Sequence, residues 1–137
     1  MNAEPGAVYL DSSALVKLVI DEAESEQLRD HLAARPVRVA CALVRVEVPR
    51  AVAGQGRRAR DRARRLLGGL HVIALDDPLL DQAATLGPGA LRSLDAIHIA
   101  AALELGDQLE SLVTYDSRMI DSALRLGVSV ASPGALS

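Results

Sequence analysis

Short apolar runs alternate along the chain with longer segments whose apolar residues recur at helical spacing. Residues 7–11 form the first run, and their consecutive apolar positions are typical of a strand buried on both faces. Further strands are predicted at 38–40, 71–75, 112–114 and 128–130. The segments between them predict helices at 13–19, 22–34, 43–53, 57–67, 94–105 and 117–126, a helix that begins at Asp77-Pro78, and a loop at 87–89.

Strand–helix alternation of this kind predicts an α/β fold: a central parallel sheet of about five short strands with helices on both faces. No internal repeat or low-complexity linker interrupts the pattern, so we expect a single domain over 1–137 with its core at about 7–130. Ligands of such sheets bind at the carboxyl ends of the strands. We expect the Asp21-x-x-Glu24 pattern to cap the helix over 22–34, Asp77 to cap the helix that begins at Pro78, and Ser93 to cap the helix that carries Asp95.

The composition narrows the class of protein. The 137 residues are 50% hydrophobic, which is enough for a packed core without cross-links, and Cys41 is the single cysteine. An internal disulfide is excluded, and a reducing compartment is the simpler expectation. No secretory signal pattern and no run long enough for a membrane span is present, so we expect a soluble, cytoplasmic protein that does not contact a membrane.

The charge is unevenly distributed. The net charge is −3, yet eight of the fifteen basic residues are arginines between Arg45 and Arg65. An acidic protein can therefore still present one basic face to nucleic acid phosphates. The arginines of 57–65 either form a solvated helix face or contact RNA or a protein partner, and the sequence leaves both open. Tyr9 and Tyr115 are the only aromatic residues, so a base-stacking surface for single strands is not expected.

Four carboxylates stand in sequence that otherwise resembles protein core: Asp11, Glu47, Asp95 and Asp116. Burying an ionised carboxylate is costly unless it is paired or bound to metal, so we interpret the four as one shared acidic site. Each also has a structural alternative. Asp11 and Asp116 are placed to cap helices, Asp95 lies in a helical first turn, and Glu47 either pairs with a base such as Arg45 or points into a site.

A cluster of carboxylates favours the hard cations Mg²⁺ or Mn²⁺, which prefer oxygen ligands. Bound metal activates water and neutralises phosphate, so hydrolysis of a phosphodiester is the indicated chemistry. No catalytic Ser-His-Asp order, cysteine nucleophile, zinc pattern or phosphate-binding glycine fingerprint competes with it. His98 follows Asp95 by three positions, and we interpret it as a packed residue that supports the site at most.

The residues around these acids resemble a known family. Val8-Tyr9-Leu10-Asp11-Ser12-Ser13-Ala14 is similar to the opening of PIN-domain ribonucleases, particularly the VapC-like toxins of bacterial toxin–antitoxin pairs. Three further segments resemble the later motifs of that family, in the same order: Val46-Glu47-Val48-x-Arg50-Ala51, Leu94-Asp95-Ala96-Ile97-His98-Ile99-Ala100 and Thr114-Tyr115-Asp116-x-Arg118-Met119. Four motifs in order, spread over residues 7 to about 130, make the resemblance specific.

The resemblance implies a PIN-like fold and a metal-dependent endoribonuclease that acts as a toxin. Asp11, Glu47, Asp95 and Asp116 would then be catalytic residues that hold Mg²⁺ or Mn²⁺, supported by Thr114 and by Ser12 or Ser13. It also implies an RNA substrate, a homodimer and an antitoxin whose tail reaches the acidic pocket. The family pattern gives Asp121 no role, and we leave it as an outer ligand to be tested. Two alternatives stay open: a non-catalytic binding module, and a phosphatase with Asp11 as nucleophile, which the serine at position 13 disfavours.

Overall fold

The computed structural model describes residues 6–87 and 91–135. Within them it contains the strands β1 (Ala7–Leu10), β2 (Arg38–Cys41), β3 (His71–Ile73), β4 (Leu109–Val113) and β5 (Val130–Ala131). The α-helices are α1 (Ser12–Val19), α2 (Ser25–Ala33), α3 (Val44–Val52), α4 (Arg57–Gly68), α5 (Asp77–Ala84), α6 (Ser93–Leu103) and α7 (Ser117–Arg125). A short 3₁₀-helix, η1 (Gly106–Gln108), precedes β4. The predicted elements are confirmed with shifted ends, and residues 88–89 of the predicted loop lie outside the described part.

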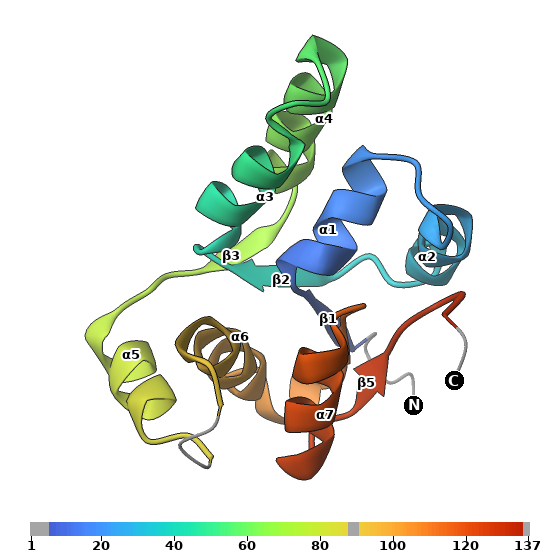
Figure 1. The fold of residues 1–137 in the computed structure, drawn as a ribbon. Helices are drawn as coiled ribbons and strands as arrows, with labels where there is room; N and C mark the ends of the chain where they lie inside the picture. Colours follow the sequence, from blue (N-terminus) through green and yellow to red (C-terminus); the bar gives the residue numbers. More distant parts are fainter. Residues whose placement is uncertain (1–5, 88–90, 136–137) are drawn as a thin grey trace.

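The five strands form one parallel sheet in the order β3-β2-β1-β4-β5. Helices α1 to α4 lie on one side of the sheet, and α5 to α7 lie on the other (Figure 1). Each side has its own apolar core, so the molecule is a three-layer α/β/α structure. The predicted fold class is therefore confirmed.

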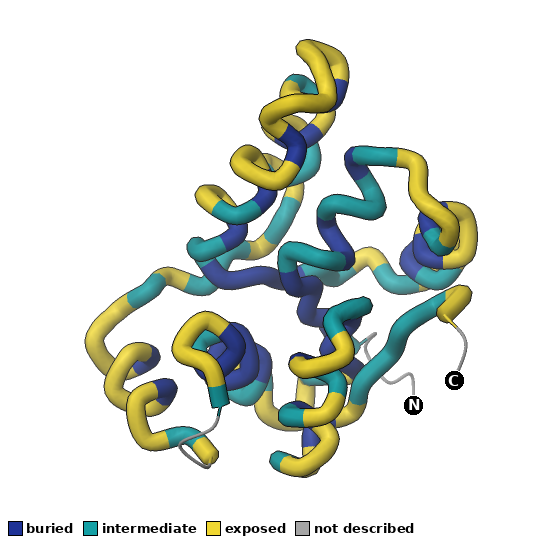
Figure 2. Tube along the Cα trace, viewed as in Figure 1, coloured by how far each residue is buried: buried dark blue, intermediate teal, exposed yellow. Residues whose placement is uncertain are grey.

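Strand β1 lies at the centre of the sheet and is buried along its whole length, as its uninterrupted apolar run predicted (Figure 2). Successive side chains of a strand point to opposite faces, and the two cores divide them accordingly. Tyr9 packs with Ile99 in the core beneath α6, whereas Val8 and Leu10 pack in the core beneath α1. This alternation anchors the strand that leads into Asp11.

The path of the chain creates a switch point at the carboxyl end of β1. From β1 the chain proceeds to β2 and β3 through helices on one face, and then crosses to β4 on the other side of β1. The connections that follow β1 and β4 therefore leave in opposite directions, which opens a crevice between them. Asp11 and Thr114 each directly follow one of these two strands.

Three predicted helix caps are wrong. Helix α2 begins at Ser25 without a side-chain cap, because Glu24 instead pairs with Lys17 at 2.7 Å. Asp76, not Asp77, caps α5 by accepting a hydrogen bond from the backbone of Leu79. Helix α6 already includes Ser93, so its cap position is Arg92, which makes no side-chain capping bond.

Helices α3 and α4 pack against each other and form an arm that projects from the sheet (Figure 1). No helix within the described residues is both long and apolar enough to cross a membrane.

Candidate functional site

All four carboxylates line one cavity at the carboxyl end of the sheet. The cavity has a volume of about 300 Å³, and we call it the acidic cavity. Its walls come from the starts of α1, α6 and α7 and from the first turns of α3, four segments that are distant in sequence. The other lining residues are Ser12, Ser13, Arg92, Ser93, Leu94, His98 and Met119. The structure thus brings together the acids that the sequence singled out.

Asp11 is held in place on every side. Its Oδ1 accepts hydrogen bonds from the Ser13 hydroxyl at 2.7 Å and from the backbone N–H of Ala14 at 3.1 Å. Its Oδ2 accepts a short hydrogen bond from the Thr114 hydroxyl. The structural alternative is therefore true as well, since Asp11 is the cap of α1. Capping fixes the carboxylate at the rim of the cavity, where its remaining lone pairs face the site.

Thr114 and Ser13 join the ends of β1 and β4. The Thr114 hydroxyl, which is fully buried, also accepts a hydrogen bond from the backbone N–H of Asp116 at 3.1 Å. The Ser13 hydroxyl accepts another from the backbone of Tyr115 at 2.9 Å. Asp116 itself caps α7 through the backbone of Arg118. Two hydroxyls thus set the spacing of two candidate ligands, and of the two serines it is Ser13 that supports the site by hydrogen bonds.

Glu47 is oriented by a buried chain of hydrogen bonds. His98 Nε2 lies 2.8 Å from Glu47 Oε1, and its other nitrogen, Nδ1, lies 2.7 Å from the Tyr9 hydroxyl. That hydroxyl also accepts a hydrogen bond from the backbone N–H of Cys41 at 3.1 Å. Glu47 therefore pairs with His98 rather than with Arg45, and still lines the cavity. His98 has a larger role than the sequence indicated, because it contacts a candidate ligand directly.

Asp95 is the acid with the fewest partners. Its side chain is only 8% exposed, yet among the described residues no donor lies within hydrogen-bonding distance of its carboxylate. Burial raises the pKa of Asp95, the charge of Asp116 raises it further, and Arg92 opposes both effects. Burial also raises the pKa of Asp11, against the hydrogen bonds from Ser13 and Thr114. The site therefore concentrates negative charge that its own hydrogen bonds do not balance.

Burial alone would lower the pKa of His98, but its hydrogen bonds to Cys41 and Glu47 raise it to about 10. A positive charge on His98 is thus favoured beside the carboxylate that it orients.

A divalent cation fits the donor set of this cavity. Carboxylate oxygens are the ligands that Mg²⁺ and Mn²⁺ prefer, and the Asp95 oxygens lack a donor of their own. The geometry is open: within residues 6–87 and 91–135, no three acidic, histidine or cysteine side chains converge tightly enough to enclose a metal ion. Mg²⁺ commonly retains several waters and takes only one or two carboxylates, so a wide cavity with dispersed acids suits it better than a closed cage.

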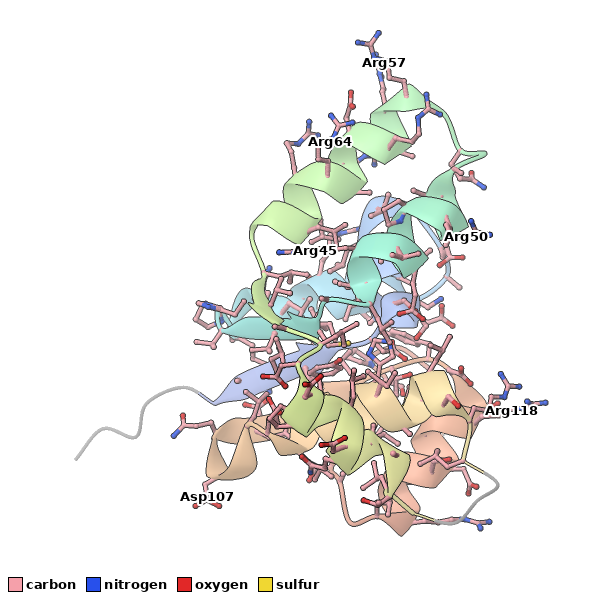
Figure 3. The ribbon with its side chains drawn as sticks, turned by 90° about the vertical axis from the view of Figure 1, so that its left-hand side faces the viewer. Arg45, Arg50, Arg57, Arg64, Asp107 and Arg118 are labelled. Atoms are coloured by element: carbon pink, nitrogen blue, oxygen red, sulfur yellow. The ribbon has the colours of Figure 1, made fainter. Side chains whose placement is uncertain are left out.

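Two expectations about other charged residues need comment. Asp121 does not line the acidic cavity; it lies on α7 and pairs with Arg125 at 3.2 Å. The arginines of 57–65 lie along exposed faces of α4, and Arg57 and Arg64 point outward from the arm (Figure 3). Their function is not decided by this placement. Sequence reasoning missed Tyr9, whose only signal was a polar hydroxyl inside a strand buried on both faces.

An α/β sheet with acids gathered at its central switch point is the arrangement that the motifs implied. The chain belongs to the PIN-domain family, whose model matches residues 8–123. It is 50% identical to Ribonuclease VapC46 of Mycobacterium tuberculosis over 127 residues, which cover 93% of this chain and 98% of that protein.

Two solved structures have the same fold. The crystal structure of Mycobacterium tuberculosis VapC20, a toxin that cleaves the sarcin–ricin loop, matches with a TM-score of 0.68 and 19% identity, covering 84% of this chain and 94% of VapC20. A toxin–antitoxin complex from Klebsiella pneumoniae contains a chain that matches with a TM-score of 0.69 and 19% identity, covering 92% of this chain and 97% of that one.

Proposed function

We propose that this protein is a metal-dependent endoribonuclease that hydrolyses RNA phosphodiester bonds and acts as the toxin of a toxin–antitoxin pair. The observation that carries the proposal is the single cavity lined by Asp11, Glu47, Asp95 and Asp116. Family membership and 50% identity to a ribonuclease over nearly the whole chain support it. Mg²⁺ or Mn²⁺, when bound, would neutralise the phosphate and make water acidic enough to supply the attacking hydroxide.

The protein's own residues position and tune the site. Thr114 and Ser13 hold the Asp11 carboxylate so that it loses little freedom when it binds a cation. His98 holds Glu47 in the same manner. Asp95, which lacks a donor, contributes charge that a cation would relieve. No side chain needs to attack the phosphorus, and the three hydrogen bonds that Asp11 accepts disfavour its use as a nucleophile in the phosphatase alternative.

Metal binding is tested by thermal unfolding, without any requirement for activity. Millimolar Mn²⁺ should raise the unfolding midpoint of the wild type, because a ligand that binds only the folded state stabilises it. The shift should be lost in Asp11→Asn, a variant that keeps a good helix cap. Asp30→Asn, which removes an exposed acid on α2, is the matched control and should shift like the wild type. An equal response in all three proteins would refute a metal site at Asp11.

Catalysis is tested with cellular RNA. Incubation with Mg²⁺ or Mn²⁺ should give defined fragments whose ends map the cleavage sequence. EDTA and the Asp95→Asn substitution should each abolish cleavage, while Asp30→Asn should retain it. A protein that binds metal and RNA but cuts neither cellular RNA nor the mapped sequence would instead be the non-catalytic module.

An antitoxin and a second copy of the chain are the proposed protein partners. The antitoxin is supported by the likeness to a chain of a toxin–antitoxin complex, and the homodimer by the family resemblance. The antitoxin should suppress RNA cleavage when the two proteins are purified together. Light scattering should give twice the chain mass of 14.4 kDa for the protein alone, and a monomer at micromolar concentration would refute the dimer.

A further inference from the structure

A second cavity adjoins the acidic one. It also has a volume of about 300 Å³, and three arginines line it: Arg92, Arg118 and Arg125. We call it the arginine cavity. Arg92 and Asp95 line both cavities, so the two are neighbours that share a wall. This second cavity has no part in the functions assigned above.

The arginine cavity holds uncompensated positive charge beside the acids. Among the described residues, no carboxylate lies within ion-pair distance of Arg92 or Arg118, whereas Arg125 pairs with Asp121 at 3.2 Å. Arg118 projects from the molecule at the end of α6 and α7 (Figure 3). Two exposed guanidinium groups without protein partners are free to bind an anion, and their planar donors match the oxygens of a phosphate.

Apolar side chains form the rest of the wall. Leu91 and Leu126 are half-buried and line the cavity, and both approach Gly87 closely enough that a Cβ there would lie 3.5 Å from the first and 3.6 Å from the second. A cavity with an apolar wall and a guanidinium rim suits a nucleotide, whose base contacts the wall or stacks on an arginine while its phosphate pairs with the rim. Its volume lies at the lower end of the range for small-ligand pockets.

We propose that the arginine cavity binds the nucleotide next to the one at the scissile bond, and that Arg118 and Arg92 pair with its phosphate. This inference rests on the proposed ribonuclease function. RNA carries one phosphate per nucleotide, so a strand whose scissile phosphate sits in the acidic cavity must place the next phosphate close by. The shared wall at Arg92 and Asp95 provides that continuity, and an acidic peptide would have no such reason to enter both cavities.

The test removes one charge from each side of the proposed contact. Two oligonucleotides carry the mapped cleavage sequence, one unmodified and one with neutral methylphosphonates at the phosphates that flank the scissile one. Wild-type protein should cleave the neutral RNA with kcat/KM about tenfold lower, the loss of one good charge-assisted contact. Arg118→Gln should lower kcat/KM about tenfold with unmodified RNA, and the methylphosphonate should then have little further effect. Arg92→Gln should behave in the same way.

Arg29→Gln is the matched control. Arg29 is an exposed arginine on α2 that pairs with Asp21 at 3.8 Å, and it lines neither cavity. It should cleave both RNAs as the wild type does, and unfolding midpoints should show that all variants fold.

If Arg118→Gln and Arg92→Gln cleave both RNAs like the wild type, the subsite is refuted and the ribonuclease function stands. If they retain cleavage but escape inhibition by the antitoxin, the cavity binds peptide and the inference is overturned. If the wild type cleaves no RNA with either metal, the proposed function fails, and the subsite fails with it.

Discussion

Replacing Tyr9 with phenylalanine should reveal how much the buried hydrogen-bond chain contributes. Tyr9 is completely buried, and its hydroxyl contacts both the backbone N–H of Cys41 and the Nδ1 of His98. Tyr9→Phe keeps the ring and removes only this hydroxyl. Two buried polar groups then lose a partner, and leaving such a group unsatisfied costs about 1–3 kcal/mol.

We expect a loss of about 2–4 kcal/mol in the free energy of unfolding, since Nδ1 keeps a weak contact with Cys41 Sγ at 3.7 Å. Domains of this kind have unfolding free energies of only about 5–15 kcal/mol, so the effect should be easy to measure. The assay is equilibrium unfolding in urea in the presence of EDTA. The transition midpoint should fall while the slope stays that of the wild type.

Tyr115→Phe is the matched control. The Tyr115 hydroxyl donates to the carbonyl oxygen of Pro133 at 2.7 Å from a half-buried side chain, so water can replace it. That variant should lose less than about 1 kcal/mol. Equal losses in the two variants, or a loss below about 1 kcal/mol in Tyr9→Phe, would refute the view that the chain is a satisfied, buried network.

Three further predictions concern the acidic cavity. The pKa of Asp95 is raised above its ordinary value of 3.8, so the folded protein binds this proton more tightly than the unfolded chain. In EDTA the wild type should therefore lose stability relative to Asp95→Asn as the pH rises from 3.8 through the folded-state pKa, as urea unfolding at several pH values would show. Thr114→Val should abolish most Mn²⁺-dependent RNA cleavage because Asp11 loses a donor, and Thr114→Ser should restore it; equal activity in both would contradict the role of the hydroxyl. Ser13→Ala should cost about 1–2 kcal/mol in urea unfolding, whereas Ser12→Ala, which makes no side-chain hydrogen bond in the described structure, should cost under about 0.5 kcal/mol; the reverse order would refute the assignment.

The fold was largely predictable because its strongest signals are local. Four consecutive apolar residues in β1 indicate a strand that is buried on both faces, and alternation with helices restricts the sheet to a parallel one. Helix starts were less predictable. Glu24 has the chemistry of a cap, but its pairing with Lys17 depends on how α1 and α2 pack, and nothing in the adjacent residues reveals that.

The candidate acids were predictable for a different reason. An acid at the end of a buried strand is costly, so Asp11 stands out in the amino-acid sequence alone. Asp116 was the weakest of the four, and it is indeed a helix cap as well as a cavity residue. The contacts that orient these acids were not predictable, since Glu47 and His98 are 51 positions apart and meet only when two layers pack around the sheet.

The position of β4 has a consequence for the birth of the protein on the ribosome. Strand β1 is made first, but one of its two edges stays open until β4 emerges, more than a hundred residues later. Until then Asp11 has no Thr114 to hold it and no Asp116 beside it. A prematurely terminated chain is thus harmless in a way that a finished one is not. For a nuclease encoded in the cell whose RNA it would cut, this order of synthesis delays danger until translation is nearly complete.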